Sequence, residues 1–171
     1  MNRLHIATRG ACSWRDRLAK PDTQWERRYS ALEAAVAWEV AAGADRGTVG
    51  GLPRPLEQLF VGGSFGKPPL LLAVAEHKVP LAGRGGDSQG VVWALVRTAA
   101  GVVSLSVEAK AREPFGTGNQ SLEAWLSLDE PGRSKDNRQE RWTFIQQHLP
   151  PAVGSGYLLV AYQLLHRCAA A

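Results

Sequence analysis

Cysteine is scarce in this sequence, and the two that occur, Cys12 and Cys168, stand near opposite ends of the chain. No CxxC spacing accompanies them, so neither a disulfide scaffold nor a cysteine zinc site is expected. Apolar runs fall well short of the roughly 18 residues that span a bilayer, and the first residues lack the apolar segment of a secretory signal. We therefore expect a cytoplasmic protein that does not associate with membranes.

Internal repeats and blocks of like charge are also missing, which argues against solenoid folds and charged tails. The 171 residues are 44% hydrophobic and 21% charged, as in an ordinary globular protein, and one domain is the simplest organisation for this length. Lys and Arg number 20 against 16 Asp and Glu. The formal charge of +4 is compatible with a polyanionic partner such as nucleic acid, without requiring one.

The first 22 residues are basic and show no apolar periodicity, so we predict an arm that binds polyanions and does not stabilise the fold. Its cations are Arg3, Arg9, Arg15, Arg17 and Lys20. Residues 23–171 are then the single domain. From Gln24 to Ala42 apolar residues recur at three- and four-residue steps, which predicts an amphipathic helix. The predicted buried stripe consists of Trp25, Tyr29, Leu32, Val36 and Val40, with Glu33 at its border.

Three strands are predicted after this helix. Residues 70–76 and 91–97 are short apolar runs flanked by Pro and Gly, and residues 102–110 alternate apolar with polar side chains. The tight connection at 99–101 makes the last two strands an antiparallel hairpin. The remaining predicted helices are a turn or two at 56–60, then 122–126 and 136–149. Residues 157–167 fit either a strand or a helix, and their continuation into Cys168-Ala-Ala-Ala favours the helix.

The third strand carries the pattern with most chemical content, because Glu108 and Lys110 stand two residues apart and therefore point the same way. The carboxylate can ligate Mg²⁺, and the ammonium can steady a hydroxide or the charge that develops on a phosphate. The alternative is a solvated Glu/Lys pair at a polar strand end. Glu33 adds a second acid, because a carboxylate beside a buried stripe needs a partner or a metal.

Other polar groups have weaker patterns. Glu76 closes the first strand, either as a site acid or in an ion pair at the edge of the core, and with His77 it offers an acid/base pair for a small-molecule enzyme. Gln163, His166 and Arg167 share one helix face, where they would meet phosphate or cap the core. The glycine-rich stretch Gly83–Gly86 lacks the strand and helix context of a P-loop, which argues against nucleotide binding there.

The order of a helix with Glu33, two strands, a strand ending in Glu108-Ala109-Lys110 and a further helix resembles the common core of the PD-(D/E)XK phosphodiesterase superfamily. This superfamily includes restriction enzymes and junction resolvases. The resemblance implies an α/β (α+β) restriction-endonuclease-like core, in which a helix precedes a three-stranded antiparallel meander with flanking helices. Shorter segments look like a family of uncharacterised bacterial proteins: Tyr29–Glu33, Glu76–Leu81, Val107–Lys110 with Glu113–Gly116, and Tyr162–Arg167.

One position departs from the superfamily pattern, which has an Asp near the start of the second strand. Here Val91 or Val92 stands across from Glu108, depending on a one-residue choice of register. Asp87 in the preceding loop or Glu76 on the neighbouring strand would have to replace that acid.

The resemblance implies a nuclease dependent on Mg²⁺ or Mn²⁺, in which Glu108 binds the metal with Asp87 or Glu76. Lys110 would orient the attacking water, and Glu33 would be an outer ligand or base. The alternative is a catalytically degenerate fold that binds nucleic acid or a protein through the arm and the face of residues 163–167.

Overall fold

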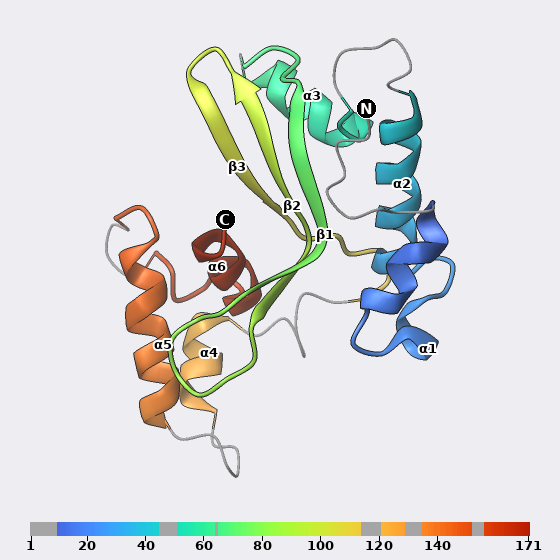
Figure 1. Cartoon of the computed structure of the whole chain (residues 1–171). Helices are drawn as coiled ribbons and strands as arrows, with labels where there is room; N and C mark the ends of the chain where they lie inside the picture. Colours follow the sequence, from blue (N-terminus) through green and yellow to red (C-terminus); the bar gives the residue numbers. More distant parts are fainter. Residues whose placement is uncertain (1–9, 45–50, 64, 114–120, 129–134, 152–155) are drawn as a thin grey trace. The chain divides into compact units, whose positions relative to one another are not determined.

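The computed structural model describes residues 10–44, 51–63, 65–113, 121–128, 135–151 and 156–171, and their packing separates two units (Figure 1). Unit 1 comprises Met1–His77 and Gly90–Glu113, and unit 2 comprises Lys78–Gln89 and Pro114–Ala171. None of the described helices is long and apolar enough to cross a membrane. The organisation of residues 23–171 as one domain stays a prediction.

The strands form the predicted antiparallel meander in the order β1-β2-β3, comprising β1 Leu70–Val79, β2 Ser88–Thr98 and β3 Gly101–Val107. The β2–β3 register runs from Val92 opposite Val107 to Thr98 opposite Gly101, with a two-residue turn between the strands. Gly101 adopts a φ of 129°, which a side chain would disfavour. The mixed α+β class with flanking helices is thus confirmed, although β3 ends three residues before the predicted boundary.

In unit 1, the helical elements are η1 Ala11–Arg17, α1 Pro21–Gln24, α2 Ser30–Ala44 and α3 Arg54–Gly62. Helix α2 buries Ala31, Ala34, Ala35 and Trp38, while Val36 and Val40 of the predicted stripe are exposed. The predicted stripe is therefore wrong at Val36 and Val40, whereas Trp25, Tyr29 and Leu32 are partly buried. Small alanines let the helix backbone approach its neighbours closely, and one tryptophan fills the remaining space, so this face buries more than its hydrophobicity suggests.

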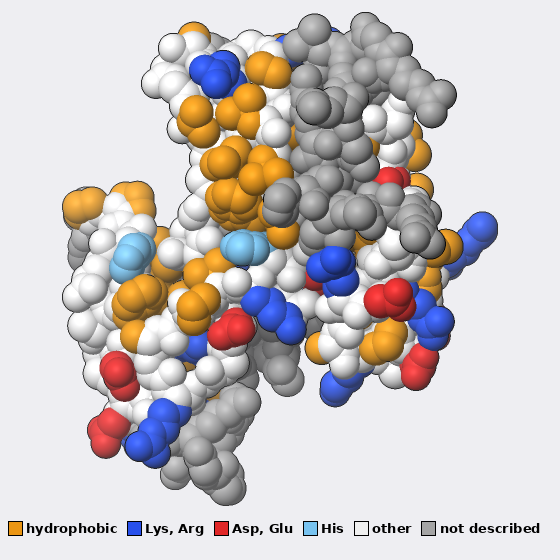
Figure 2. All heavy atoms as spheres, viewed as in Figure 1, with side chains coloured by type: hydrophobic (Ala, Val, Ile, Leu, Met, Phe, Trp, Pro, Cys, Tyr) orange, Lys and Arg blue, Asp and Glu red, His pale blue; other side chains and the backbone are white. Residues whose placement is uncertain are grey.

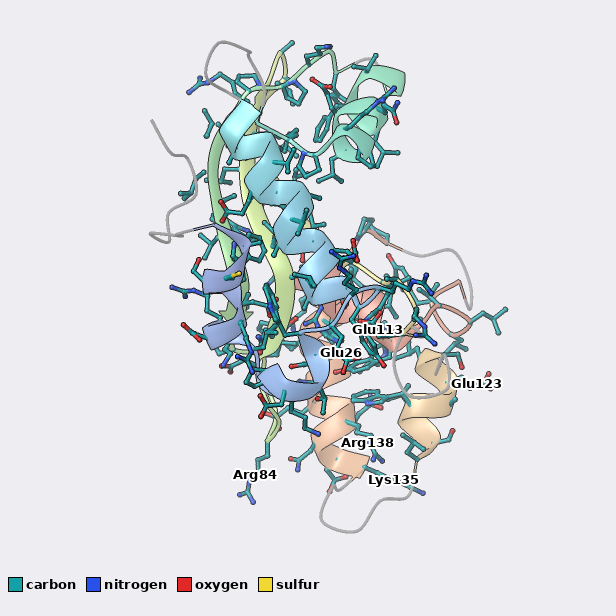
Figure 3. All side chains as sticks on the ribbon, turned by 90° about the vertical axis from the view of Figure 1, so that its right-hand side faces the viewer. Glu26, Arg84, Glu113, Glu123, Lys135 and Arg138 are labelled. Carbon is teal, nitrogen blue, oxygen red and sulfur yellow. The ribbon has the colours of Figure 1, made fainter. Side chains whose placement is uncertain are left out.

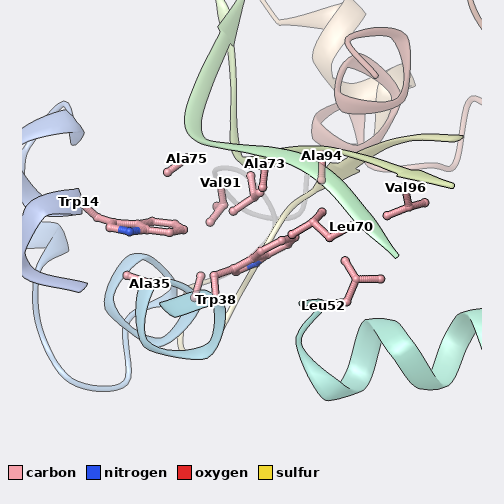
Figure 4. Packing of buried hydrophobic residues seen from close by; sticks show 12 residues of the cluster. Trp14, Ala35, Trp38, Leu52, Leu70, Ala73, Ala75, Val91, Ala94 and Val96 are labelled. Carbon is pink, nitrogen blue, oxygen red and sulfur yellow. The ribbon is translucent and has the colours of Figure 1, made fainter. Parts of the chain in front are cut away.

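Trp14 of η1 corrects the prediction of an arm without structural role. Its side chain is only 1% exposed and belongs to the same core as Trp38 of α2 and Val92 of β2. Figure 4 shows Trp14 and Trp38 directed toward the alanines and valines of the strands. The indole Nε1–H also donates to the Glu39 carboxylate at 2.9 Å. A single tryptophan can be buried without any repeating pattern of apolar residues around it, so the search for apolar periodicity missed Trp14. Arg3 and Arg9 of the predicted arm lie outside the described residues.

Unit 2 contains the helices α4 Leu122–Ser127, α5 Lys135–Gln147 and α6 Tyr162–Ala169. Their common core consists of Leu122, Trp142, Ile145 and Leu165. Helices α4 and α5 confirm the predicted segments, but α6 begins at residue 162 rather than 157. The preceding residues form a turn, and Ala161 makes an isolated bridge with Ser121 that holds the start of α6 beside α4.

Candidate functional site

Glu108 and Lys110 follow directly after β3 and face each other. Lys110 Nζ lies 3.0 Å from Glu108 Oε1, and the glutamate side chain is only 8% exposed. The prediction that these two side chains point the same way is confirmed. A pair this well shielded from water interacts more strongly than a surface ion pair, and either charge left alone there would be costly.

The neighbouring strand offers no acid at the corresponding position. Because Val92 lies opposite Val107, the next residue along β2, Val91, is the one that approaches Glu108. Both valines are buried members of the unit 1 core. The register thus resolves the two alternatives in favour of Val91, and an apolar side chain occupies the place where the superfamily pattern has an aspartate.

Glu33 is exposed, contrary to the prediction that it borders the buried face of the helix. Its carboxylate accepts a hydrogen bond from the backbone N–H of Arg28 at 2.9 Å. Arg28 has a φ of 70°, uncommon for a residue with a side chain, so Glu33 satisfies a backbone donor in a strained turn just before α2. Its role as an outer metal ligand or base stays a prediction.

The remaining predicted acids lie in different surroundings. Glu76 is half-buried in β1 with a φ of 53°, and its neighbour His77 packs its ring 5.4 Å from that of Trp93. Asp87 is exposed in the loop that belongs to unit 2. The ring contact favours a packing role for His77 over acid/base chemistry, and the roles of Glu76 and Asp87 as metal ligands stay predictions.

The donor set around Glu108 does not by itself fit a resident Mg²⁺. This cation prefers an octahedron of oxygens with one or two carboxylates from the protein, but one Glu108 oxygen already contacts the Lys110 ammonium, which repels a metal ion. Among the described residues, no group of three or more His, Cys, Asp or Glu side chains is placed to hold a metal. No catalytic step is therefore derived through a metal at this position.

Of the three residues on the predicted α6 face, His166 and Arg167 both contact the hydroxyl oxygen of Ser88. Arg167 Nη1 donates to the Ser88 hydroxyl at 2.8 Å, and His166 Nδ1 lies 2.9 Å from the same oxygen. Burial and the positive charges of Arg167 and Arg141 lower the pKa of His166 from 6.5 to about 3. The ring is neutral near pH 7, and the Ser88 oxygen already accepts from Arg167, so we assign His166 Nδ1 as the acceptor of the Ser88 proton.

The low pKa of His166 and the hydrogen bond from Arg167 to Ser88 favour a structural role for this pair over the roles of a nucleophile and its base. Gln163, the third member of the predicted face, is half-buried one turn earlier. The binding role of this face stays a prediction.

Sequence reasoning gave no role to Glu113, which anchors the segment after β3 to the start of α2 (Figure 3). Its carboxylate accepts from the Ser30 N–H at 2.9 Å and hydroxyl at 2.5 Å, and from the N–H groups of Ala111 and Arg112, both at 3.1 Å. Burial tends to raise the pKa of Glu113, but the bonds from Ser30 and the backbone outweigh it and lower the pKa from 4.5 to about 2. Ser30 lies 83 residues away in the sequence, so only the tertiary structure reveals its contact with Glu113.

Sequence reasoning also passed over a polar hollow in unit 2. It has a volume of about 140 Å³ and lies between the loop Gly83–Gly86 and helices α4, α5 and α6. The loop can lie against α5 because its glycines lack side chains: a Cβ on Gly83 would come within 2.9 Å of the Asn137 carbonyl oxygen. The run of glycines at 83–86 was the sequence signal for this hollow, because glycines allow a loop to pack closely against a helix as well as to form a P-loop.

A second hollow lies in unit 1 between α3 and β3 and is apolar, with a volume of about 250 Å³. Figure 2 shows hydrophobic side chains gathered over the strands of this unit, whereas Lys and Arg side chains are scattered among carboxylates on the same view. The net charge therefore forms no continuous basic track on this face. Leu59, Phe60, Phe65, Leu105 and Val107 are among the residues that line the apolar hollow.

The protein is of the mixed α+β class, with a three-stranded antiparallel sheet and a Glu108–Lys110 ion pair just after the last strand. The chain belongs to the family described as "Domain of unknown function (DUF6946)", whose model matches residues 7–171. No curated protein and no solved structure matches the chain. The predicted membership of an uncharacterised family is confirmed, while membership of the PD-(D/E)XK superfamily stays a prediction.

Proposed function

We propose that this chain is a nucleic-acid-binding protein with a PD-(D/E)XK-like core that does not hydrolyse its ligand. The observation that carries the proposal is the closed ion pair between Glu108 and Lys110, beside a strand that presents Val91 where a second acid would stand. A shielded carboxylate neutralised by its own lysine is poorly placed to recruit a divalent cation. The same ion pair stabilises the conformation of the chain just after β3.

The nucleic-acid part of the proposal rests on charge. The chain has a net charge of +4, and three arginines, Arg84, Arg138 and Arg141, line the hollow of unit 2. Guanidinium groups recognise phosphate oxygens through paired hydrogen bonds and keep their charge at all physiological pH values. Binding of this kind is dominated by phosphate contacts and weakens steeply with salt.

A metal-dependent nuclease is the second candidate, and the juxtaposition of an acid and a lysine at the end of a strand favours it. In that case Asp87 or Glu76 has to supply the further carboxylate. The two candidates differ in one measurable respect, because only the nuclease cuts a phosphodiester bond.

The test uses the purified full-length chain with labelled single- and double-stranded DNA and RNA, in Mg²⁺, in Mn²⁺ and in EDTA. We expect salt-sensitive binding that is unchanged by EDTA, with the labelled strands intact. Cleavage that disappears in EDTA and in Glu108→Ala would instead establish the nuclease. Absence of binding to all four nucleic acids at low salt would overturn both candidates.

The variant Val91→Asp tests whether the site is a nuclease site that has lost one of its acidic residues. This variant restores a carboxylate beside Glu108, and Val102→Asp, at an exposed position of β3, is the control for the added charge. Metal-dependent cleavage that appears with Val91→Asp, but neither with the control nor with the unchanged chain, supports a fold that has lost one ligand. Circular dichroism of both variants checks that the buried charge leaves the fold intact.

A further inference from the structure

We propose that the hollow of unit 2 binds a phosphate group, carried at the end of a nucleic-acid strand or on a free nucleotide. Arg84, Arg138 and Arg141 line the hollow, and none of the described lining residues is a carboxylate. The site is separate from the Glu108–Lys110 pair, which belongs to unit 1. The proposal that the phosphate is carried by a nucleic-acid strand rests on the proposed function, whereas the proposal of a phosphate site does not.

Arg141 provides the most specific indication of a ligand. Its Nη2–H donates to the Gly86 carbonyl oxygen at 2.6 Å, which fixes the guanidinium against the loop. Its Nε is buried and has no hydrogen-bond partner among the described residues. A buried guanidinium N–H without a partner is costly, and an anion in the hollow would remove that cost.

Arg138 is held in place from two sides. Its side chain comes from α5 (Figure 3), the residue is only 4% exposed, and a guanidinium nitrogen donates to the Leu128 carbonyl oxygen. The guanidinium carbon lies 6.0 Å from the centre of the Trp125 ring, which stacks on Tyr162 with ring centres 3.7 Å apart. These contacts orient the cation before any ligand arrives, so binding loses little side-chain entropy.

Arg84 occupies the loop at the edge of the hollow. Figure 3 shows its side chain extending outward from the loop, and it makes no ion pair with any other described residue. An exposed arginine in a glycine-rich loop retains the freedom to turn toward an anion. Arg167 adds a further positive charge nearby, and with Arg141 it contributes to lowering the pKa of His166.

Size and charge together favour a terminal phosphate. A volume of about 140 Å³ is several times the space that one water molecule needs, so the hollow has room for a phosphate group. A phosphate monoester carries a charge of about −1.5 to −2 at neutral pH, which matches two fixed guanidinium groups. An internal phosphodiester carries one charge and continues on both sides, so it fits a small hollow less well.

The experiment compares two single-stranded oligonucleotides of one sequence, with a 5′-phosphate and with a 5′-hydroxyl, together with a 5′-mononucleotide and inorganic phosphate. We expect the phosphorylated strand to bind at least tenfold more tightly than the hydroxyl strand, since charge-assisted bonds to one phosphate supply a factor of this order. All three phosphate ligands should shift the backbone amide NMR signals of Gly83–Gly86.

Arg141→Gln should abolish the preference for the phosphorylated strand, and Arg84→Ala should reduce it. Arg97→Gln removes the same charge from an exposed position of β2 and should leave the preference unchanged. Gly85→Ala tests the hollow without changing any charge, because its Cβ would come within 2.6 Å of Arg141 Nη1 and displace the guanidinium. This variant keeps the test valid if Arg141→Gln fails to fold.

Equal binding of the two strands, with no shift at Gly83–Gly86, would overturn the phosphate site and leave the proposed function standing. Inorganic phosphate and the mononucleotide shifting the loop while neither oligonucleotide binds would support the site and overturn the nucleic-acid function. A preference for the phosphorylated strand that survives in both Arg141→Gln and Gly85→Ala would also refute the assignment to this hollow.

Discussion

Glu113→Gln should destabilise unit 1 in a pH-dependent way, because the carboxylate is a four-fold acceptor that joins the segment after β3 to α2. The variant keeps the shape of the side chain but removes the charge and replaces one oxygen with an NH₂ group. That group faces N–H and O–H donors and cannot accept from them. A negative charge beside the first residue of α2 also interacts favourably with the helix dipole.

The magnitude follows from the pKa. Lowering the pKa of Glu113 from 4.5 to about 2 corresponds to about 3 kcal/mol at about 1.4 kcal/mol per pKa unit. Glu113 is half-buried, and solvent screening reduces the expected contribution to about 1–2 kcal/mol. Because the folded pKa is the lower one, this stability is fully present above pH 4.5 and is lost as the pH falls toward 2.

Chemical denaturation at pH 7 and at steps below pH 4.5 measures this contribution, with hydrogen exchange of the α2 amides reporting on unit 1. Wild type and Glu113→Gln should differ by about 1–2 kcal/mol at pH 7 and converge at acid pH. Glu26→Gln, at an exposed position of the same unit, is the matched control. A Glu113→Gln variant as stable as the wild type at pH 7, or a difference that persists unchanged at pH 2, would refute the reasoning.

Four further outcomes are expected. Trp14→Ala should lower the free energy of unfolding by about 3–5 kcal/mol. Arg15→Ala, which breaks only an exposed ion pair with Asp22, should lower it by less than about 1 kcal/mol. Equal effects of the two variants in denaturation would show that Trp14 does not stabilise the fold. Glu108→Gln and Lys110→Met should each destabilise by about 1–3 kcal/mol, and the double variant by less than their sum; strict additivity would exclude a structural ion pair. Gly83→Ala should destabilise by about 1–3 kcal/mol, because its φ is 84° and the Asn137 oxygen is close, while Gly86→Ala meets nothing within 4 Å and should be tolerated. The His166 ring should stay neutral by NMR down to pH 4, so that protonation of the unfolded chain lowers stability as the pH falls from 6.5 to 3; a titration near pH 6.5 would contradict its burial among cations.

Much of the local structure was predictable, because it depends on neighbours in the sequence. Alternation along 102–110 and the short connection at 99–101 predicted the β2–β3 hairpin, which forms with a two-residue turn. The spacing of Glu108 and Lys110 predicted that the two side chains point the same way, and their charged atoms lie 3.0 Å apart. The two residues meet although they lie just beyond β3, which ends at Val107, so the contact was predictable but the extent of the strand was not.

The candidate site as a whole was less predictable. The sequence left Val91 and Val92 as alternatives across from Glu108, and only the strand register decided for Val91. Glu33 was expected at the border of the buried stripe, but α2 turns its alanine face inward, and the Glu33 carboxylate accepts from the backbone N–H of Arg28 instead. Hydrophobicity ranks valine above alanine, whereas close packing of a helix can prefer the smaller side chain.

The sequence by itself thus determined the three strands, most of the helices, their order and the contacts within one turn, because backbone propensity and periodicity act locally. Tertiary structure alone decided which groups from distant segments share one environment. Glu113 meets Ser30 across 83 residues, and Ser88 meets Arg167 across 79. Such long-range contacts depend on how the packed elements are arranged, and no local pattern in a single sequence encodes that arrangement.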